Sequence, residues 1–180
     1  MTDSLNITYN TLDINDINSL GDYESSMYRA FSGTEIQTLD RIWNIDHKKR
    51  KIKTKIPYES QKIYVARLEG KIVSGVAINV NMNDTLQLEM MGFTIDKDDK
   101  TAEGLGVFNL SVLTSFNPVV ILLKNHAFEV VTKLGIEKMY GTCSEKKLRG
   151  YRILGWEPID DRLFLGEKKY LLRIPLGSKQ

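Results

Sequence analysis

The chain contains a single candidate for a nucleophilic thiol. Its one cysteine, Cys143, follows the apolar stretch Lys138–Thr142, and its only histidines are His47 and His126. A nucleophilic thiol needs a base such as histidine to remove its proton. A small apolar residue also serves well just past a buried strand, and His126 lies beside the apolar stripe of a predicted helix. The sequence therefore favours a packing role for Cys143 and a boundary position for His126.

Length and composition indicate an ordinary globular protein. The chain has 180 residues, of which 42% are hydrophobic and 27% charged, with a formal net charge of +2. No apolar run approaches the roughly 18 residues that cross a bilayer, and the first ten residues lack the pattern of a secretory signal. A single cysteine excludes an internal disulfide and suits a reducing compartment. We expect one domain over residues 1–180, a cytoplasmic location, no membrane span and no nucleic-acid partner.

Hydrophobic periodicity predicts the elements of the N-terminal half. Thr34 and Gln37 form a capping-box pattern, which predicts a helix that turns Leu39, Ile42 and Trp43 inward. The pair Glu69-Gly70 is typical of a tight hairpin turn. The predicted elements are a strand at Ile7–Leu12, helices at Ile14–Phe31 and from Thr34 onward, and strands at Lys62–Leu68 and Lys71–Val80.

The C-terminal half alternates strands and helices, which favours parallel pairing there. Asn117-Pro118 begins the clearest helix, because an N-cap residue is followed by proline at the first helical position, and Gly135 ends it. The other predicted elements are strands at Glu103–Leu113 and Lys138–Thr142, a short helix with Leu148, Tyr151 and Leu154 on its inner face, and strands at Trp156–Ile159 and Lys169–Ile174. The order predicts an α/β fold with one mixed sheet and helices on both faces.

The short helix carries the most specific motif. It ends at Gly155, where a left-handed cap is expected, and residues 151–159 read Y-R-I-L-G-W-E-P-I. This segment resembles the Tyr-x-x-Leu-Gly-Phe-(Glu) signature of the GCN5-related N-acetyltransferase superfamily. The resemblance implies the acyl-CoA N-acyltransferase fold. It also implies a role for Tyr151, because in that superfamily this tyrosine often points at the sulfur of the thioester donor.

The superfamily holds the pyrophosphate of coenzyme A with a Gln/Arg-x-x-Gly-x-Gly/Ala loop before a helix. The nearest match here is Thr101–Gly106, with both glycines present and threonine in place of Gln or Arg. Strand-like residues follow it, so a bulge or close packing explains Gly104 and Gly106 better than a phosphate loop. The loop Leu113–Pro118, before the proline-initiated helix, is the predicted replacement.

The stretch LQLEMMGFTIDKDDKTAEGLGVFNLSV is similar to a region of the N-acyl amino acid synthases and the related acyl-homoserine-lactone synthases. The resemblance places Glu103 on the fourth strand, where the amine meets the thioester. Met27–Phe31 and Trp43 resemble acceptor-side residues of that branch. Gly106 replaces its arginine and a basic run its acidic cluster, which disfavours a homoserine-lactone synthase. The branch favours a longer acyl chain, with Met90, Met91, Phe93 and Phe108 lining a tunnel or belonging to the core.

These resemblances imply a mechanism in which an amine attacks a thioester. Glu103 is the candidate base, directly or through water, and Tyr151 the candidate acid. Strand amides of the fourth strand can polarise the carbonyl. The predicted donor-binding residues are Phe108, Asn109, Leu110, Asn117 and Val119. We expect no metal and no permanently bound cofactor, with acyl-CoA or an acyl carrier protein as the co-substrate.

Basic residues form two clusters. The run from Asp46 to Lys55 includes Lys48, Lys49, Arg50 and Lys51. Such a run is usually a solvated helix end, but it could also dock coenzyme A phosphates or an acyl carrier protein. The second cluster, on the Tyr151 helix, comprises Lys146, Lys147, Arg149 and Arg152. No aromatic residues are interleaved with the run, which disfavours nucleic acid.

The sequence thus predicts an N-acyltransferase that moves an acyl group from a thioester to an amine. The alternative is a non-catalytic domain of the same architecture that has lost the usual pyrophosphate loop and serves in binding or assembly. The amine acceptor is small, and no residue pattern names it.

Overall fold

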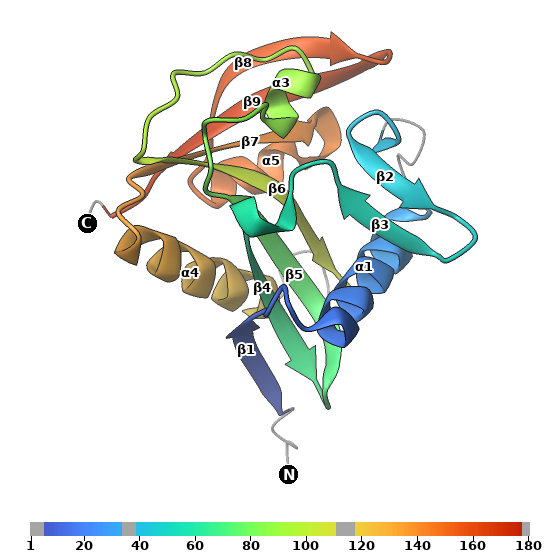
Figure 1. Cartoon of the computed structure of the whole chain (residues 1–180). Coiled ribbons are helices and arrows are strands. Elements are labelled where there is room, and N and C mark those ends of the chain that lie inside the picture. The colour runs from blue at the N-terminus through green and yellow to red at the C-terminus, as the bar shows by residue number, and fades with distance from the viewer. Residues whose placement is uncertain (1–5, 34–38, 111–117, 178–180) are drawn as a thin grey trace.

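Figure 1 shows the computed structural model, which describes residues 6–33, 39–110 and 118–177. Within these residues, seven strands form one sheet in the order β1-β4-β5-β6-β7-β9-β8. Only the β6–β7 pair is parallel. The seven strands predicted from the sequence are confirmed, with shifted ends. Their bounds are β1 Ile7–Thr11, β4 Gln61–Leu68, β5 Lys71–Asn79, β6 Thr101–Asn109, β7 Lys138–Ser144, β8 Glu157–Phe164 and β9 Glu167–Pro175.

Helices cover both faces of this sheet (Figure 1). Helix α1 (Ile17–Phe31) buries Tyr23 and Met27 in a hydrophobic cluster on one face. Helix α4 (Pro118–Lys133) and helix α5 (Glu145–Ile153) contribute to the cluster on the other. A short helix, α3 (Gln87–Met90), and a 3₁₀ turn (Tyr58–Ser60) lie in the connections. The predicted plan of one mixed sheet between helical layers is therefore confirmed.

The basic run is a hairpin, so the prediction of a helix end there was wrong. Residues 34–38, with the capping-box pattern, lie outside the described part of the chain. Beyond them, β2 (Trp43–Asp46) pairs with β3 (Lys51–Thr54) in a separate two-stranded sheet. The Asp46 carboxylate accepts the Lys49 N–H (2.8 Å), and Arg50 takes a positive φ of 55°. A side chain that closes a turn on its own backbone competes with helix formation.

Two turns match their predictions. Glu69 and Gly70 have φ values of 50° and 79°, which a two-residue hairpin turn between β4 and β5 requires. Gly155, with φ 91°, ends α5, and the Trp156 N–H donates to the Tyr151 carbonyl (3.0 Å). This is the hydrogen bond of a glycine-capped helix end, and it fixes where Tyr151 and Trp156 lie.

The two central strands separate part-way along their length. Ladder pairing between β6 and β7 covers Thr101–Glu103 and Lys138–Tyr140. Beyond it, residues 104–109 of β6 stay with β5, and residues 141–144 of β7 stay with β9. The register of β6 against β5 shifts at Leu105, so a β-bulge lies at the point of separation. Such bulges bend a strand and often occur beside active sites.

No helix within the described residues is long and apolar enough to cross a membrane.

Candidate active site

A cavity of about 80 Å³ lies where β6 and β7 separate. Its floor is the two strands, and its walls come from α1, the β2–β3 hairpin, α3, α5 and the β8–β9 hairpin. The lining residues are Phe31, Leu39, Ile42, Trp43, Gln87, Met91, Leu105, Gly106, Val107, Thr142, Cys143, Ser144, Lys147, Tyr151, Phe164 and Lys169. Segments from most of the chain thus meet at one gap in the sheet.

The two sides of the cavity differ in polarity. The side formed by α1, β2, α3 and β6 is mostly aromatic and aliphatic, whereas the side formed by β7, α5 and β9 carries hydroxyl and ammonium groups. Lys147 lies over the Phe31 ring (5.7 Å to its centroid), and Lys169 pairs with Glu167 (2.9 Å). No carboxylate lines the cavity among the residues described. This arrangement suits a ligand with an apolar end and a polar end.

Trp43 forms the end of the apolar side. Its ring meets Phe31 edge-on, with centroids 4.9 Å apart. A Cβ added to Gly106 would lie 3.2 Å from Cζ2 of Trp43, so the indole rests directly on the strand backbone. The indole N–H donates to Oε1 of Gln87 (2.6 Å), and Nε2 of Gln87 donates to the Leu105 carbonyl (2.9 Å). Gln87 therefore connects Trp43 to the bulge of β6.

Tyr151 lines the cavity from α5. Its ring is held edge-on against Trp156, with centroids 5.9 Å apart and planes at 89°. Burial raises the pKa of Tyr151 above its ordinary value, and nearby Cys143 adds to the rise. The phenol therefore keeps its proton at neutral pH, as a proton donor must. The structure places Tyr151 at the cavity, and its role as the acid stays a prediction.

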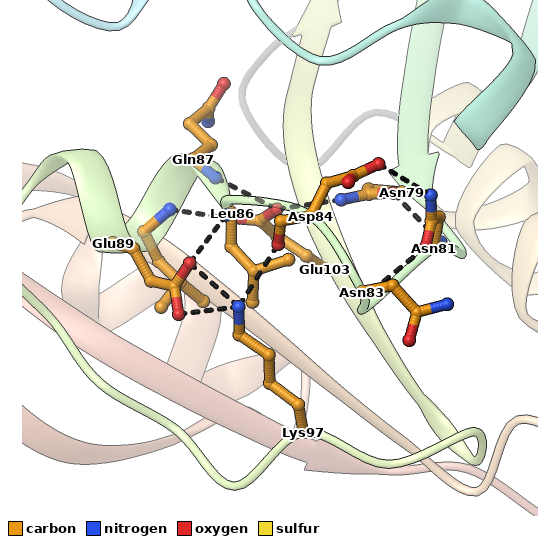
Figure 2. Close-up of polar contacts among 10 residues, drawn as sticks. Asn79, Asn81, Asn83, Asp84, Leu86, Gln87, Glu89, Lys97 and Glu103 are labelled. Atoms are coloured by element: carbon orange, nitrogen blue, oxygen red, sulfur yellow. Dashed lines mark hydrogen bonds and ion pairs between the residues drawn. The ribbon is translucent and has the colours of Figure 1, made fainter.

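Glu103 lies beside the cavity but does not line it. It is 1% exposed, and its Oε1 accepts the Leu88 N–H (2.6 Å). Its Oε2 accepts the Gln87 N–H (3.1 Å) and an amide hydrogen of Asn79 (3.3 Å), as Figure 2 shows in part. Desolvation by burial raises the pKa of Glu103 to about 7, although the two backbone hydrogen bonds oppose the rise. The carboxylate thus fixes the start of α3, and its role as a base stays a prediction.

Further contacts brace the connection that contains α3 (Figure 2). Glu89 accepts the Leu86 N–H (2.8 Å) and pairs with Lys97 (2.7 Å). Lys97 also donates to the Asp84 carbonyl (3.1 Å). The segment between β5 and β6, which the sequence pattern left least defined, is therefore held by buried and half-buried polar groups.

Known proteins resemble this chain in fold rather than in sequence. No protein-family model and no curated protein sequence matches the chain. Solved structures do match over nearly its whole length. The ribosomal-protein-S18-alanine N-acetyltransferase from Escherichia coli superposes with a TM-score of 0.63 at 11% identity, covering 97% of this chain and 96% of that one. The chain has the GCN5-related N-acetyltransferase fold.

Two acyl-homoserine lactone synthases share this acetyltransferase fold. The CoA-dependent enzyme MesI matches with a TM-score of 0.69 at 17% identity, covering 96% of this chain and 89% of MesI. LasI matches with a TM-score of 0.72 at 10% identity, covering 95% and 89%. The resemblance of this chain to the acetyltransferases and to that branch is confirmed for the fold.

The predicted donor-binding residues are not all on one surface of this acetyltransferase fold. The Phe108 side chain is in the core against Tyr23 (5.9 Å between centroids). The Leu110 N–H is bound by the Val73 carbonyl (2.7 Å), and Asn109 ends β6. The Val119 side chain is buried under α4. Asn117 lies outside the described residues. Their contacts with a donor stay predictions, and those of Phe108 and Val119 would involve backbone atoms.

The glycine pair belongs to strand β6, so Thr101–Gly106 does not form the phosphate loop before a helix. Gly104 and Gly106 instead flank the bulge, and Gly106 leaves room for Trp43. The prediction that a bulge and close packing explain these glycines is confirmed. The predicted replacement, Leu113–Pro118, lies almost entirely outside the described residues, so binding of the donor phosphates at the start of α4 stays a prediction.

Cys143 is buried and lines the cavity, but neither histidine does. His126 packs edge-on against Tyr64 on the α4 face (5.8 Å), and His47 lies near the Tyr28 hydroxyl (3.2 Å). The described residues contain no cluster of three or more His, Cys, Asp and Glu side chains that could hold a metal.

Sequence reasoning missed Gln87 and Lys169, whereas Phe31 and Trp43, which resemble acceptor-side residues, do line the cavity. Gln87 sits in a segment without clear periodicity, so nothing marked its side chain as inward. Lys169 begins a predicted strand and would be expected in solvent, yet it is only 6% exposed. A buried lysine beside a cavity is a functional signal only once the fold is known.

Proposed function

We propose that this protein transfers an acyl group from a thioester to a small amine. The observation that carries the proposal is the gap between β6 and β7, with a cavity that contains Tyr151 at one side and an apolar end at the other. The solved structures that share the fold include an N-acetyltransferase and a CoA-dependent acyl-homoserine lactone synthase. An acyl thioester placed in the gap would lie against the edge of β6 that β7 leaves unpaired.

The unpaired edge of β6 supplies the electrostatic part of the mechanism. Strand N–H groups that would otherwise bind β7 can donate to the thioester carbonyl as negative charge develops on its oxygen. The bulge at Leu105 turns the strand at this point. The amine nitrogen then attacks the carbonyl carbon, a C–N bond forms, and the C–S bond breaks.

Protons move in two places in this reaction. The departing thiolate takes a proton from the Tyr151 hydroxyl, whose raised pKa keeps it protonated until that moment. The amine must lose a proton, and Glu103, with a pKa of about 7, is our candidate base. Because Glu103 does not line the cavity and binds two backbone N–H groups, it would act through an intervening water.

The donor is acyl-CoA or an acyl carrier protein. The N-terminal backbone of α4 follows β6 in the chain and suits phosphate, because helix N-termini attract anions. Lys48, Lys49 and Arg50 are exposed at the tip of the β2–β3 hairpin, and they offer a positive surface to an acidic carrier protein. The hairpin is the surface that we assign to the carrier, if a carrier is the donor.

Two measurements test the proposal. Thermal unfolding with coenzyme A, acetyl-CoA and longer acyl-CoAs should show a rise in melting temperature for a donor that binds the folded state. Release of free thiol from the same donors, with a panel of small amines, should be faster than without protein. No thermal shift and no thiol release with any acyl-CoA or acyl carrier protein would overturn the acyltransferase proposal and leave a binding module of the same fold.

A further inference from the structure

We infer that the polar side of the cavity is a binding subsite for a carboxylate carried by one of the reacting substrates. The subsite consists of the start of α5, the Ser144 hydroxyl and the ammonium groups of Lys147 and Lys169. The inference rests on the proposed function, because it names a chemical group that a substrate of that site carries. It assigns the three side chains to substrate binding rather than to the chemical step.

Ser144 is the N-cap residue of α5, but its hydroxyl does not cap the helix. The side chain makes no hydrogen bond to the amides of the first turn, although a serine at this position usually does. It lines the cavity, the residue is only 9% exposed, and Oγ has no hydrogen-bond partner within the described parts of the chain. A buried hydroxyl without a partner costs free energy, and a ligand that binds it would remove that cost.

The start of α5 favours a negative charge at this point. The first N–H groups of a helix have no partner within the helix, and they attract anions. Helix α5 is nine residues long. Glu145, the acidic side chain of its first turn, does not line the cavity, and its Oε1 lies 3.5 Å from the Tyr170 hydroxyl. The helix N-terminus therefore keeps its positive potential on the cavity side.

Two ammonium groups flank the Ser144 hydroxyl. Lys147 places its Nζ over the Phe31 ring, 5.7 Å from the centroid, on the far side of the cavity. Lys169 lies directly opposite Ser144 in the β7–β9 ladder, where paired side chains point to the same face of the sheet. Lys169 is only 6% exposed and pairs with the partly exposed Glu167 (2.9 Å). An ammonium group has three N–H donors, so it can bind Glu167 and a ligand together.

The chemistry of these groups suits a carboxylate. Hydroxyl, backbone N–H and ammonium groups all donate hydrogen bonds, and such bonds are strongest when the acceptor is ionised. The described residues that line the cavity include no carboxylate of their own. An ionised carboxylate has two oxygens with about four acceptor positions, which is enough for Ser144 and both lysines.

The phosphates of the donor are not the ligand of this subsite. We propose their binding at the start of α4, where Val119 packs into the cluster on the α4 face of the sheet. Side chains alternate between the two faces along a strand. Cys143, next to Ser144, belongs to the cluster on the α4 face, whereas Leu171, two positions from Lys169, belongs to the cluster on the α1 face. Ser144 and Lys169 thus point away from α4, and the carboxylate belongs to the acceptor or to the acyl group.

Matched substrate pairs distinguish these two sources. Thiol release is measured with glycine against glycinamide as acceptor, and with succinyl-CoA against butyryl-CoA as donor. Each pair differs in the carboxylate and little in size. The pair that carries the relevant group should show kcat/KM about tenfold higher for its carboxylate member, as expected for one charged hydrogen bond. No such preference in either pair would overturn the inference while the acyltransferase proposal stands.

Substitutions decide whether the preference comes from the subsite. Lys169→Met should lower it about tenfold and Ser144→Ala about fivefold, because the first removes a charged and the second a neutral hydrogen bond. Lys168→Met is the matched control, since Lys168 is exposed on the same strand and pairs with Asp161 (3.3 Å). It should leave the preference unchanged. A preference that survives in both Lys169→Met and Ser144→Ala would overturn the inference.

Ratios of two substrates on one variant do not depend on how much of the variant is folded. If Lys169→Met yields no folded protein, Lys147→Met replaces it, because Lys147 is exposed on α5. A fall in the same preference is expected, and an unchanged preference would contradict the subsite.

Thermal unfolding gives a readout without turnover. Sodium succinate should raise the melting temperature of the wild type more than sodium chloride does at equal ionic strength, because it binds the folded state. This difference should disappear in Lys169→Met, and an equal difference in both proteins would overturn the subsite. Absence of thiol release with every substrate pair overturns the acyltransferase proposal, and the succinate measurement then decides separately whether the subsite exists.

Discussion

The paired and the separated halves of β6 and β7 differ in what holds them. At the paired end, Asp98 connects the strands by accepting from Thr101 Oγ1 (2.5 Å) and pairing with Lys138 (2.9 Å). In the separated half, two glycines lie against tryptophan rings, whereas Gly104 faces Met139. Trp43 lies on Gly106 on one face, and Trp156 lies near Gly141 on the other. The paired end is thus held by an ion pair and a hydrogen bond, whereas aromatic rings pack on the strands in the separated half.

The difference shows how a sheet can contain a binding site without losing its core. Backbone groups released from the ladder would be costly if buried and unpaired. A ligand that accepts their hydrogen bonds removes that cost. The paired end keeps the two strands in register and so determines where the gap begins.

The largest expected effect comes from filling the gap. Thr142 lines the cavity in the separated half, and Thr142→Trp should lower kcat/KM by roughly 10³-fold, more than the ~10²-fold that a 1 Å misplacement of substrate can cost. Thr8→Trp, on the exposed edge strand β1, introduces the same side chain far from the gap. Full activity of Thr142→Trp in the thiol-release assay would mean that the gap is not the site of reaction.

Removal of the proposed acid comes next. Tyr151→Phe should lower kcat by about 10²-fold with little change in KM, because general acid catalysis is lost but donor binding is kept. Tyr170→Phe removes a hydroxyl on β9 that lies 3.5 Å from Glu145, and it serves as the control. Equal rates for the two variants would remove Tyr151 from the mechanism.

Glu103 should make stability depend on pH. Its pKa is raised to about 7 by burial, so between the ordinary pKa of a glutamate and pH 7 the folded state binds more protons than the unfolded state. Stability should therefore fall as pH rises through this window, by about 3 kcal/mol, and then level off. Denaturant unfolding at pH 4.5, 6 and 7.5 should show the stability of the wild type falling relative to Glu103→Gln.

The exposed Glu157→Gln on β8 controls for loss of a carboxylate. A constant difference between the wild type and Glu103→Gln across the three pH values would contradict the raised pKa. If Glu103 is also the base, kcat of the wild type should rise with pH around 7, and that dependence should disappear in Glu103→Gln.

The smallest effect is expected outside the gap, at the hairpin. Lys48→Glu with Lys49→Glu should reduce kcat/KM for an acyl carrier protein donor about tenfold, through slower association. It should leave acyl-CoA turnover unchanged. The double variant Lys62→Glu with Lys71→Glu makes the same charge change at exposed positions elsewhere. If both doubles slow the carrier reaction equally, the hairpin is not its docking surface.

The sequence predicted the fold well because local patterns determine it. The Asn117-Pro118 start, the Gly155 cap and the Glu69-Gly70 turn each specify a boundary, and the strands between them alternate or run apolar. The β2–β3 hairpin was not predicted, because the many lysines of this segment are typical of a solvated surface. The inward positions Trp43, Ile45, Ile52 and Thr54 alternate with polar residues, but each strand is only four residues long.

The site was less predictable, because its residues come from segments far apart in sequence. Tyr151 could be assigned from its motif and does line the cavity. Glu103 was assigned to the right strand, but only the structure reveals that its oxygens bind the Gln87 and Leu88 N–H groups. The hydrogen bond that holds the Trp43 indole comes from Gln87, 44 residues away, and no periodicity connects the two residues.

The β2–β3 ribbon shares no ladder with the main sheet, yet it carries the indole that bounds the cavity. The residue that bounds the cavity and the strands that form the main sheet therefore belong to separate sheets. A smaller residue in place of Trp43 would enlarge the cavity while the seven strands keep their order, so this ribbon can change the volume of the cavity without changing the main sheet.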